Sequence, residues 1–181
     1  MALRYEVRLS GSGGQGLILA GKILAEAAAI YDNKNATQSQ SYGPEARGGS
    51  SRSEVIISDT EIDYPKAVNI DFLLALTQEA CDKYSKDVKE GGTILVDSRF
   101  VTKLPEGKFK VYSAPITEIA EQETGKSLVA NIVALGMITE LTKIVSQQAV
   151  ESAILSRVPK GTEELNLKAF RAGIAAAQKL L

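Results

Sequence analysis

The feature that most constrains the fold is a glycine-rich turn close to the start of the chain. Residues 5–10 alternate between apolar and polar side chains, which is typical of a strand. Gly11-Ser-Gly-Gly-Gln-Gly16 follows directly, and from Gln15 to Tyr31 apolar residues recur at the spacing of a helix. A strand, a tight turn and a helix in this order predict a Rossmann-like opening βα unit.

The spacing of the glycines indicates a turn that can hold an anionic group. Gly11, Gly13 and Gly16 fit the pattern G-x-G-x-x-G between a strand and a helix. Glycine permits crowded or left-handed backbone, and the helix N-terminus offers free N–H groups and a positive dipole end. Gly14 adds freedom and Gln15 adds an amide, so these five residues are the candidate cofactor-binding residues. The alternative is a turn that only packs the helix on the sheet.

A complete dinucleotide site is not indicated. Such a site needs an acidic residue for the ribose hydroxyls at the end of the second strand, about 20 residues after the turn. Here Asp32 follows the first helix directly, and a polar segment comes next. A phosphate-type ligand is therefore favoured over a full NAD or FAD. A stand-alone Rossmann-type nucleotide-binding module remains an alternative function.

Strand-like and helix-like segments alternate along the rest of the chain. This predicts an α/β fold with a mostly parallel sheet, flanking helices and a helical C-terminal region. We expect residues 1–181 to form a single α/β domain. The glycine pair 91–92 is expected to end the helix that begins near residue 78. The expected strands after the opening unit are 54–58, 72–76, 93–96 and 110–113. The expected helices are 78–88, 116–123, 127–145, 146–157 and 162–181.

Composition excludes several kinds of chemistry. The chain has no His and a single Cys, Cys81, which excludes a Ser-His-Asp triad, a Cys-His pair and a self-sufficient iron–sulfur site. We therefore expect no catalytic and no metal-binding residues. With 21 Lys plus Arg against 22 Asp plus Glu, the net charge of −1 argues against a nucleic-acid partner. No apolar run suits a signal peptide or a membrane span, so a cytoplasmic location without membrane contact is expected.

Residues 32–52 are polar and almost free of large aliphatic side chains. We expect a loop without regular structure, of a length that is usually functional or disordered. Glycines, a proline, an aromatic side chain and two opposite charges gather at its far end, which is typical of an interface. The candidate subunit-interface residues are Tyr42, Gly43, Glu45, Arg47, Gly48 and Gly49. A flexible exposed loop is the alternative.

Two segments together resemble a known family. Gly-Ser-Gly-Gly-Gln-Gly with Leu-Ile-Leu-Ala-Gly-Lys at 11–22, and Ser-Tyr-Gly-Pro-Glu-Ala-Arg-Gly-Gly at 41–49, are similar to motifs of one subunit type. This type is the gamma subunit of the 2-oxoacid:ferredoxin (acceptor) oxidoreductases. Segments 72–78 and 131–136 also look like family segments in the expected order. Pro-Glu-Ala at 44–46 favours the 2-oxoglutarate type over the pyruvate type.

The resemblance implies a subunit of a larger enzyme that oxidatively decarboxylates a 2-oxoacid to an acyl-CoA. In such complexes the alpha and beta subunits hold thiamine diphosphate with Mg and bind the oxoacid. A ferredoxin-like, Cys-rich subunit holds the iron–sulfur clusters, and ferredoxin accepts the electrons. This chain would hold none of these cofactors alone and would be inactive alone.

The part played by this subunit stays open between two interpretations. The glycine turn and the polar loop could lie together at the carboxyl edge of the sheet and face the catalytic subunits or the phosphates of coenzyme A. The alternative is a purely architectural subunit without a ligand. An exposed docking surface could also self-associate, so the isolated chain could form a homodimer.

Several single residues have structural explanations. Thr77 follows a buried strand and is expected to cap the next helix. Asp97, Ser98 and Arg99 also follow a buried strand, where an α/β protein places ligand groups, and a capped loop is the favoured interpretation. Asn131 lies in an apolar helix and needs a hydrogen-bond partner, which favours a loop-tethering role. Cys81 is expected to pack in or near its helix.

Overall fold

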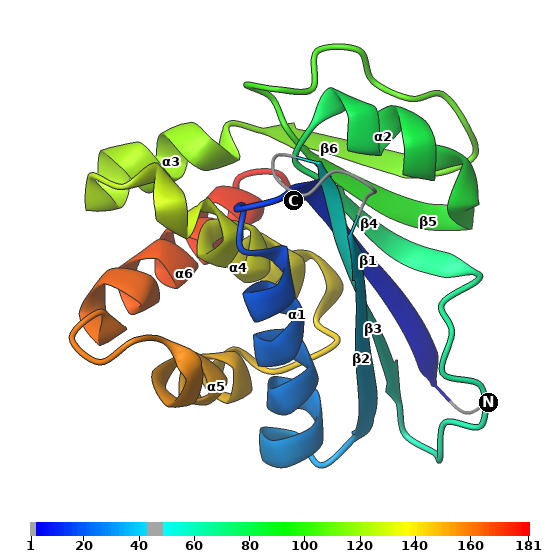
Figure 1. Cartoon of the computed structure of the whole chain (residues 1–181), viewed down its shortest axis with the longest axis horizontal. Helices are drawn as coiled ribbons and strands as arrows, with labels where there is room; N and C mark the ends of the chain where they lie inside the picture. Colours follow the sequence, from blue (N-terminus) through cyan, green and yellow to red (C-terminus); the bar gives the residue numbers. More distant parts are fainter. Residues whose placement is uncertain (1–2, 43–48) are drawn as a thin grey trace.

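The structure is a computed structural model and describes residues 3–42 and 49–181. In this part of the chain, strands and α-helices follow one another with three short turns of π or 3-10 helix (Figure 1). The strands are β1 (Arg4–Ser12), β2 (Asn35–Tyr42), β3 (Ser50–Ser58), β4 (Ile70–Ala75), β5 (Val88–Asp97) and β6 (Lys110–Ala114). The α-helices are α1 (Leu17–Glu26), α2 (Gln78–Tyr84), α3 (Ile116–Thr124), α4 (Ala130–Thr142), α5 (Gln147–Arg157) and α6 (Glu163–Gln178). The short turns are η1 (Ala27–Tyr31), η2 (Ser85–Asp87) and η3 (Ser127–Val129).

The described strands form one sheet in the order β2-β3-β1-β4-β5-β6. β1 pairs with β4, β4 with β5 and β5 with β6 in parallel, whereas β3 runs antiparallel to both β1 and β2. The predicted α/β class, with a mostly parallel sheet, flanking helices and a helical C-terminal region, is confirmed. The opening βα unit is also present, but β3 lies between β1 and β2 in the sheet.

The helices cover the two faces of the sheet unequally. α1, α3, α4, α5 and α6 lie on one face, and α2 lies on the other (Figure 1). Alternation along β1 reflects this arrangement, because Val7 and Leu9 belong to the large core under the helices. Glu6 and Arg8 point to the opposite face, where a smaller core under α2 includes Ile56.

A buried arginine joins three elements on the face under α2. Arg8 on β1 donates to Glu54 on β3 at 2.8 Å and to Asp87 in η2 at 2.7 Å. Its guanidinium carbon lies 5.0 Å from the ring centre of Tyr84. Because a buried charge is unfavourable unless it is paired, these contacts hold the end of α2 against β1 and β3.

The prediction of an irregular loop over 32–52 is wrong for residues 35–42 and 50–52, which belong to β2 and β3, while residues 43–48 lie outside the described part of the chain. β2 and β3 pair from Asn35↔Ser58 to Tyr42↔Ser51. Backbone hydrogen bonds hold this hairpin, and β2 lies at the edge of the sheet, where polar side chains can stay in water. The segment lacks large aliphatic side chains and a regular alternation of apolar and polar residues, which is why composition alone favoured a loop.

The glycine pair lies inside a strand, which corrects the predicted helix over 78–88. The helical turn ends at Asp87 and β5 begins at Val88. The pairing of β4 with β5 moves from Ile70↔Val88 to Phe72↔Thr93, so residues 89–92 bulge opposite a single residue of β4. Gly91 adopts a φ of 82° in this bulge, a conformation that favours glycine.

α4 and α6 pack closely at two glycines. A Cβ on Gly136 would overlap the carbonyl oxygen of Phe170, and a Cβ on Gly173 would overlap that of Val133. The two backbones therefore approach more closely than residues with side chains would allow. This contact fixes the middle of α4 against α6. The first residues of α4 reach the glycine turn.

Candidate functional site

The carboxyl ends of β1, β4 and β5 meet at one end of the sheet, which we call the carboxyl edge. Open α/β sheets bind ligands in this place. β1 leads into the glycine turn, β4 into the start of α2, and β5 into a loop that begins after Asp97. The pairing of β1 with β4 continues up to this edge, because Leu76 donates its N–H to the carbonyl of Ser10 at 3.0 Å.

The glycine turn is held in shape from inside. Gly14 and Gly16 adopt φ angles of 87° and 72°, in the left-handed region, and Gly16 is the N-cap of α1. The side chain of Gln15 folds back, and its Oε1 accepts the N–H of Ser12 at 2.7 Å. A Cβ on Gly11 would overlap that oxygen. Packing within the turn therefore accounts for Gly11 and Gln15.

The outward side of the turn consists of Gly13 and Gly14, the exposed glycines of the motif. No described atom lies within 4 Å of a Cβ built on Gly14. Gly13 donates its N–H to the carbonyl oxygen of Gly49 at 2.7 Å. Since β1 and β3 pair as far as Ser12↔Ser50, the turn lies beside the point where the chain enters β3.

The predicted interface residues lie only in part within the described chain. Gly43, Glu45, Arg47 and Gly48 lie outside the described residues. Tyr42 ends β2 and its backbone pairs with Ser51, while Gly49 contacts the glycine turn. β2 thus ends, and β3 begins, at the carboxyl edge.

α4 begins at the glycine turn and is tied to it by Asn131. The side chain of Asn131 is buried, and its Nδ2 donates to the carbonyl oxygen of Gly16 at 3.0 Å, which confirms the predicted tethering role. The N-termini of α1 and α4 converge there, and no side chain caps either helix at its N-cap residue. Their dipoles give this point a positive potential. Lys126, shortly before α4, is exposed and adds a positive charge.

Two of the polar side chains beside the turn are used within the fold. Thr77 caps α2 by accepting the N–H of Ala80 at 3.1 Å, as predicted. Asp97 is fully buried, and its Oδ2 accepts the N–H and the hydroxyl of Thr117 at 3.1 and 2.5 Å. The expectation of a capped loop after β5 is therefore confirmed.

Two contacts that the sequence did not predict hold the loop after β5. The Oε1 of Gln78 accepts the N–H groups of Thr102 and Lys103, both at 3.0 Å. Arg99 donates two hydrogen bonds to the carboxylate of Glu121, at 2.8 and 2.9 Å. These hydrogen bonds lower the pKa of Glu121 and raise the pKa of Arg99. The partners are distant in the sequence, so no local pattern indicates them.

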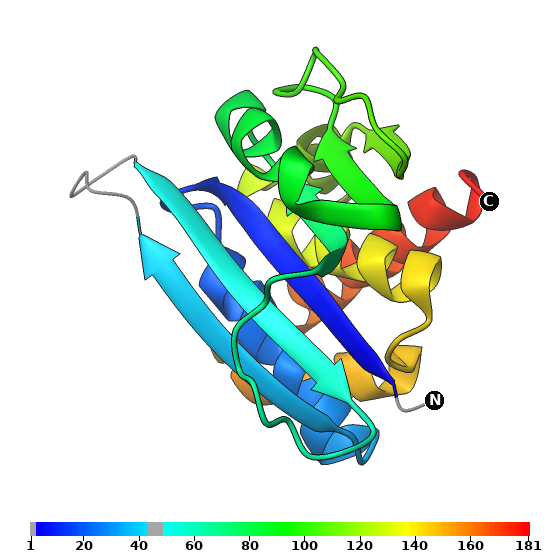
Figure 2. The same cartoon turned by 90° about the vertical axis from the view of Figure 1, so that its right-hand side faces the viewer.

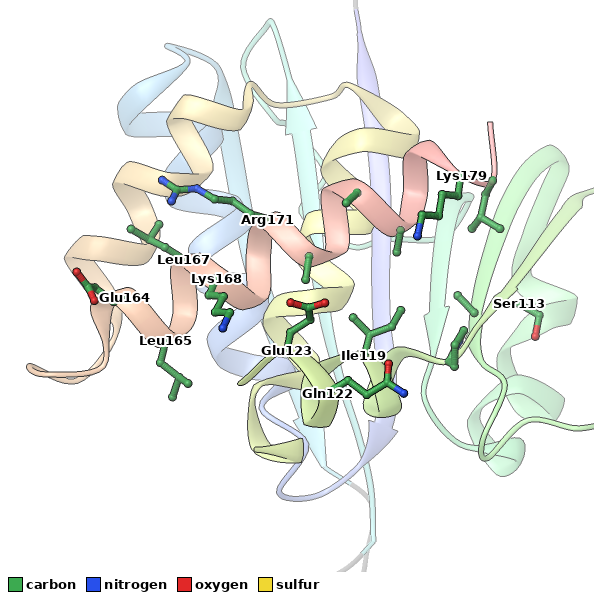
Figure 3. Close-up of a pocket in the computed structure, with 16 residues that line it drawn as sticks. Ser113, Ile119, Gln122, Glu123, Glu164, Leu165, Leu167, Lys168, Arg171 and Lys179 are labelled. Atoms are coloured by element: carbon green, nitrogen blue, oxygen red, sulfur yellow. The ribbon is translucent and has the colours of Figure 1, made fainter. Parts of the chain in front are cut away.

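A groove of about 1140 Å³ opens between α3 and α6, beside the end of β6 (Figure 3). Its apolar lining includes Ile119, Leu165 and Ala172, while Glu123 on α3 and Lys168 on α6 add charges. Sequence reasoning missed this groove, and the alanines along one side of α6 were the available signal. The groove lies at the β6 edge of the sheet, and the hairpin of β2 and β3 lies at the opposite edge.

Side chains suited to covalent or metal chemistry are buried or dispersed. Cys81 is buried, and burial, with a smaller effect of Asp82, raises the pKa of its thiol. Within residues 3–42 and 49–181, no three His, Cys, Asp or Glu side chains gather as metal ligands would. No helix of the described chain is long and apolar enough to span a membrane.

The carboxyl edge thus offers an exposed glycine turn, the N-termini of two helices and a junction with a hairpin. This is the place where open α/β sheets commonly bind ligands. The chain belongs to the pyruvate ferredoxin/flavodoxin oxidoreductase family, whose family model matches residues 6–176.

Gamma subunits of this family are similar to the chain over its whole length. The 2-oxoglutarate synthase subunit KorC of Methanocaldococcus jannaschii is 57% identical, over 98% of this chain and 96% of that protein. The crystal structure of a keto/oxoacid ferredoxin oxidoreductase gamma subunit from Geobacter sulfurreducens matches with a TM-score of 0.88 and 59% identity, over 97% of this chain and 99% of that one. The resemblance to gamma subunits, most of all those of the 2-oxoglutarate type, is confirmed. The chain is accordingly a small subunit of an oxidoreductase.

A more distant match shows the same fold within a longer chain. The 2-oxoglutarate:ferredoxin oxidoreductase from Magnetococcus marinus, with 2-oxoglutarate, coenzyme A and succinyl-CoA bound, matches 98% of this chain with a TM-score of 0.86. The identity is 23%, and the match covers 32% of that chain. At this identity the match establishes a shared fold.

Proposed function

We propose that this chain is the gamma subunit of a 2-oxoglutarate:ferredoxin oxidoreductase, and that its glycine turn helps to bind coenzyme A. The complex decarboxylates 2-oxoglutarate, transfers the succinyl group to coenzyme A and passes the electrons to ferredoxin. The observation that carries the proposal is the junction between the two glycine motifs, made by Gly13 and Gly49 beside the N-termini of α1 and α4.

The chemistry of coenzyme A fits this junction, because one end of the molecule carries several phosphate groups. Anions are stabilised at helix N-termini by about 0.3–1 kcal/mol each, and the first N–H groups of a helix have no partner within it. The N–H of Gly13 already holds the hairpin, so the N–H groups without a partner among the described residues are those of the first turn of α1. No described atom lies within 4 Å of a Cβ on Gly14, so none of the described residues blocks the approach of a phosphate.

The names of the similar proteins support the ligand and the substrate. The Magnetococcus marinus structure contains coenzyme A and succinyl-CoA, and the Methanocaldococcus jannaschii relative is a 2-oxoglutarate synthase subunit. Lys126 supplies a positive charge near the start of α4, where it can pair with a phosphate.

The other cofactors belong to partner subunits in this proposal. An iron–sulfur cluster needs several thiolates, and this chain has one Cys, which is buried. Thiamine diphosphate with Mg is assigned to the alpha and beta subunits, and the clusters to a ferredoxin-like subunit. The complex is expected in the cytoplasm, without nucleic-acid or membrane partners. We expect the purified chain alone to show no oxoacid-dependent reduction of an electron acceptor.

A purely architectural subunit is the second candidate function. The observation in its favour is that Gly11, Gln15 and Gly16 all have packing explanations within the fold. A stand-alone nucleotide-binding module has less support, because the similar proteins are subunits of oxidoreductase complexes.

Substitution of the open glycine separates these two functions. Gly14→Asn keeps a residue that tolerates the left-handed conformation and places a side chain in the path of the ligand. Gly161→Asn is the matched control, because Gly161 has a φ of 92° and open space around its Cβ position, between α5 and α6. In the assembled complex we expect Gly14→Asn to raise the KM for coenzyme A about ten-fold, equivalent to ~1.4 kcal/mol. The KM for 2-oxoglutarate should not change, and the control should match the wild type. An assembled Gly14→Asn complex with unchanged coenzyme A saturation would favour the architectural function.

A further inference from the structure

The two edges of the described sheet differ in how they are protected. β6 is short, begins with the exposed Lys110 and is followed by Pro115, and each of these features discourages pairing with a further strand. β2 is eight residues long and contains no charged residue and no proline. It pairs with β3 at every residue without a register shift. Figure 2 shows β2 at the rim of the sheet, with no described element beyond it.

A long, regular and uncharged edge strand is a template for another strand, because one row of its backbone N–H and C=O groups is unpaired. We propose that β2 pairs with the β2 of a second copy of this chain. The two strands run antiparallel about a two-fold axis, so that the sheet continues from one copy into the other. This interface does not depend on coenzyme A binding at the carboxyl edge.

The chemistry of β2 fits an identical strand. When two copies of one strand pair antiparallel, a charged residue near the axis meets its own charge, which is destabilising. The described side chains from Asn35 to Ser41 are hydroxyls, carboxamides and one alanine, which meet their own kind without repulsion. A foreign strand is selected by matching charges or large apolar side chains along the strand itself, and the described side chains of β2 from Asn35 to Ser41 offer neither.

The surroundings of the edge also suit self-pairing. Arg52 and Glu54, on the neighbouring strand β3, carry opposite charges 3.8 Å apart, so neither sign dominates beside the edge. Ile30 and Tyr31, just before β2, are 65% and 44% exposed. These side chains add apolar surface to an interface that backbone pairing alone would leave small.

Ser39 is the residue best placed to test the pairing. A Cβ on Gly21 of α1 would lie 3.6 Å from the side chain of Gln38, so Gln38 points to the α1 face. Alternation therefore places Ser39 on the opposite face, where it is exposed. Ser39 lies in the middle of β2. With the two-fold axis at Ser39 the two Ser39 side chains face each other, and with the axis at Gln38 each lies one residue from the axis.

A charge-swap experiment on the purified full chain tests the interface. We expect the wild type to be dimeric at about 100 μM by sedimentation equilibrium, and Ser39→Glu to weaken the dimer about five-fold. Ser39→Lys should weaken it less, because Ser39 lies opposite Glu54 of β3, which partly balances the new positive charge. An equimolar mixture of the two variants should recover the dimer, because opposite charges then meet across the axis. Ser113→Lys, the same substitution on the exposed edge strand β6, should leave the dimer unchanged. Circular dichroism checks that each variant is folded.

A cross-linking experiment gives a second readout. Ser39→Cys should form a dimer with a short bismaleimide, whereas Ser113→Cys should not, and the native Cys81 stays silent because it is buried. Any of three results would overturn the proposal. These are a monomeric wild-type chain, a dimer that Ser39→Glu leaves intact, and a mixture of the Lys and Glu variants that dimerises no better than Ser39→Glu alone. If the wild-type chain is monomeric because another subunit of the complex covers β2, the proposal is also overturned.

Discussion

The contact between Asn131 and Gly16 provides a quantitative test of how α4 holds the glycine turn. Asn131 donates to the carbonyl of Gly16 at 3.0 Å, and a Cβ on Gly16 would overlap the same amide group. The two residues should therefore be coupled in the free energy of unfolding. We expect Gly16→Ala to destabilise the chain less when Asn131 has already been replaced by Ala.

The magnitudes follow from the geometry. In the wild-type background Gly16→Ala combines left-handed strain of about 1–2 kcal/mol with an overlap of about 1–3 kcal/mol. Asn131→Ala alone removes a buried hydrogen bond worth about 1 kcal/mol, and the Gly16 carbonyl keeps the N–H of Ala20 as a partner at 3.1 Å. In the Asn131→Ala background only the strain remains. The coupling energy equals the relieved overlap, about 1–3 kcal/mol, with the double variant more stable than the sum of the single changes predicts.

Urea unfolding of the four chains in this double-mutant cycle gives the coupling energy directly. Asn166→Ala is the matched control, because Asn166 is also buried and donates to a backbone carbonyl, that of Thr162 at 2.9 Å, but lies in α6. Gly16→Ala should be equally destabilising in the wild-type and Asn166→Ala backgrounds. If Gly16→Ala has the same effect with and without Asn131, within about 0.5 kcal/mol, then Asn131 does not constrain the turn.

Three further predictions test the supporting structure. Gly173→Ala should destabilise the chain by about 1–3 kcal/mol in urea unfolding, because its Cβ would overlap the carbonyl of Val133, and a stability equal to wild type would refute this close packing. Thr77→Ala should lower the stability by about 1 kcal/mol through loss of the cap on Ala80, and Thr77→Ser should restore most of it. The raised pKa of the buried Cys81 thiol keeps it protonated at neutral pH, so alkylation of the folded chain should be slow and should rise only at more alkaline pH than for a free cysteine. Alkylation at neutral pH as rapid as that of a free cysteine would contradict the burial of Cys81.

The opening unit could be predicted because its signals are local. A strand pattern, left-handed glycines and a helical pattern follow one another without interruption, and the structure keeps them in that order. Thr77 and Asn131 could also be interpreted from single residues, since a hydroxyl after a buried strand caps a helix and a buried carboxamide must find a partner.

The hairpin of β2 and β3, and the hydrogen bonds of Gln78 to the loop after β5, could not be predicted because both depend on residues distant in the sequence. β2 is a strand through its pairing with β3, although it lacks the large aliphatic residues and the alternation by which a strand is recognised in a sequence. Gln78 holds the backbone of Thr102 and Lys103, residues that no local spacing connects to it. The glycine pair 91–92 has the same character, because its bulge depends on the register between β4 and β5.

The most direct measurement is hydrogen–deuterium exchange of the assembled complex with and without coenzyme A. We expect coenzyme A to slow the exchange of the amides at residues 14–18, which form the open side of the turn and the start of α1. The connection around Gly161 should exchange at the same rate in both samples. Equal exchange at residues 14–18 with and without coenzyme A, in a complex that still forms succinyl-CoA, would contradict a binding role for the glycine turn.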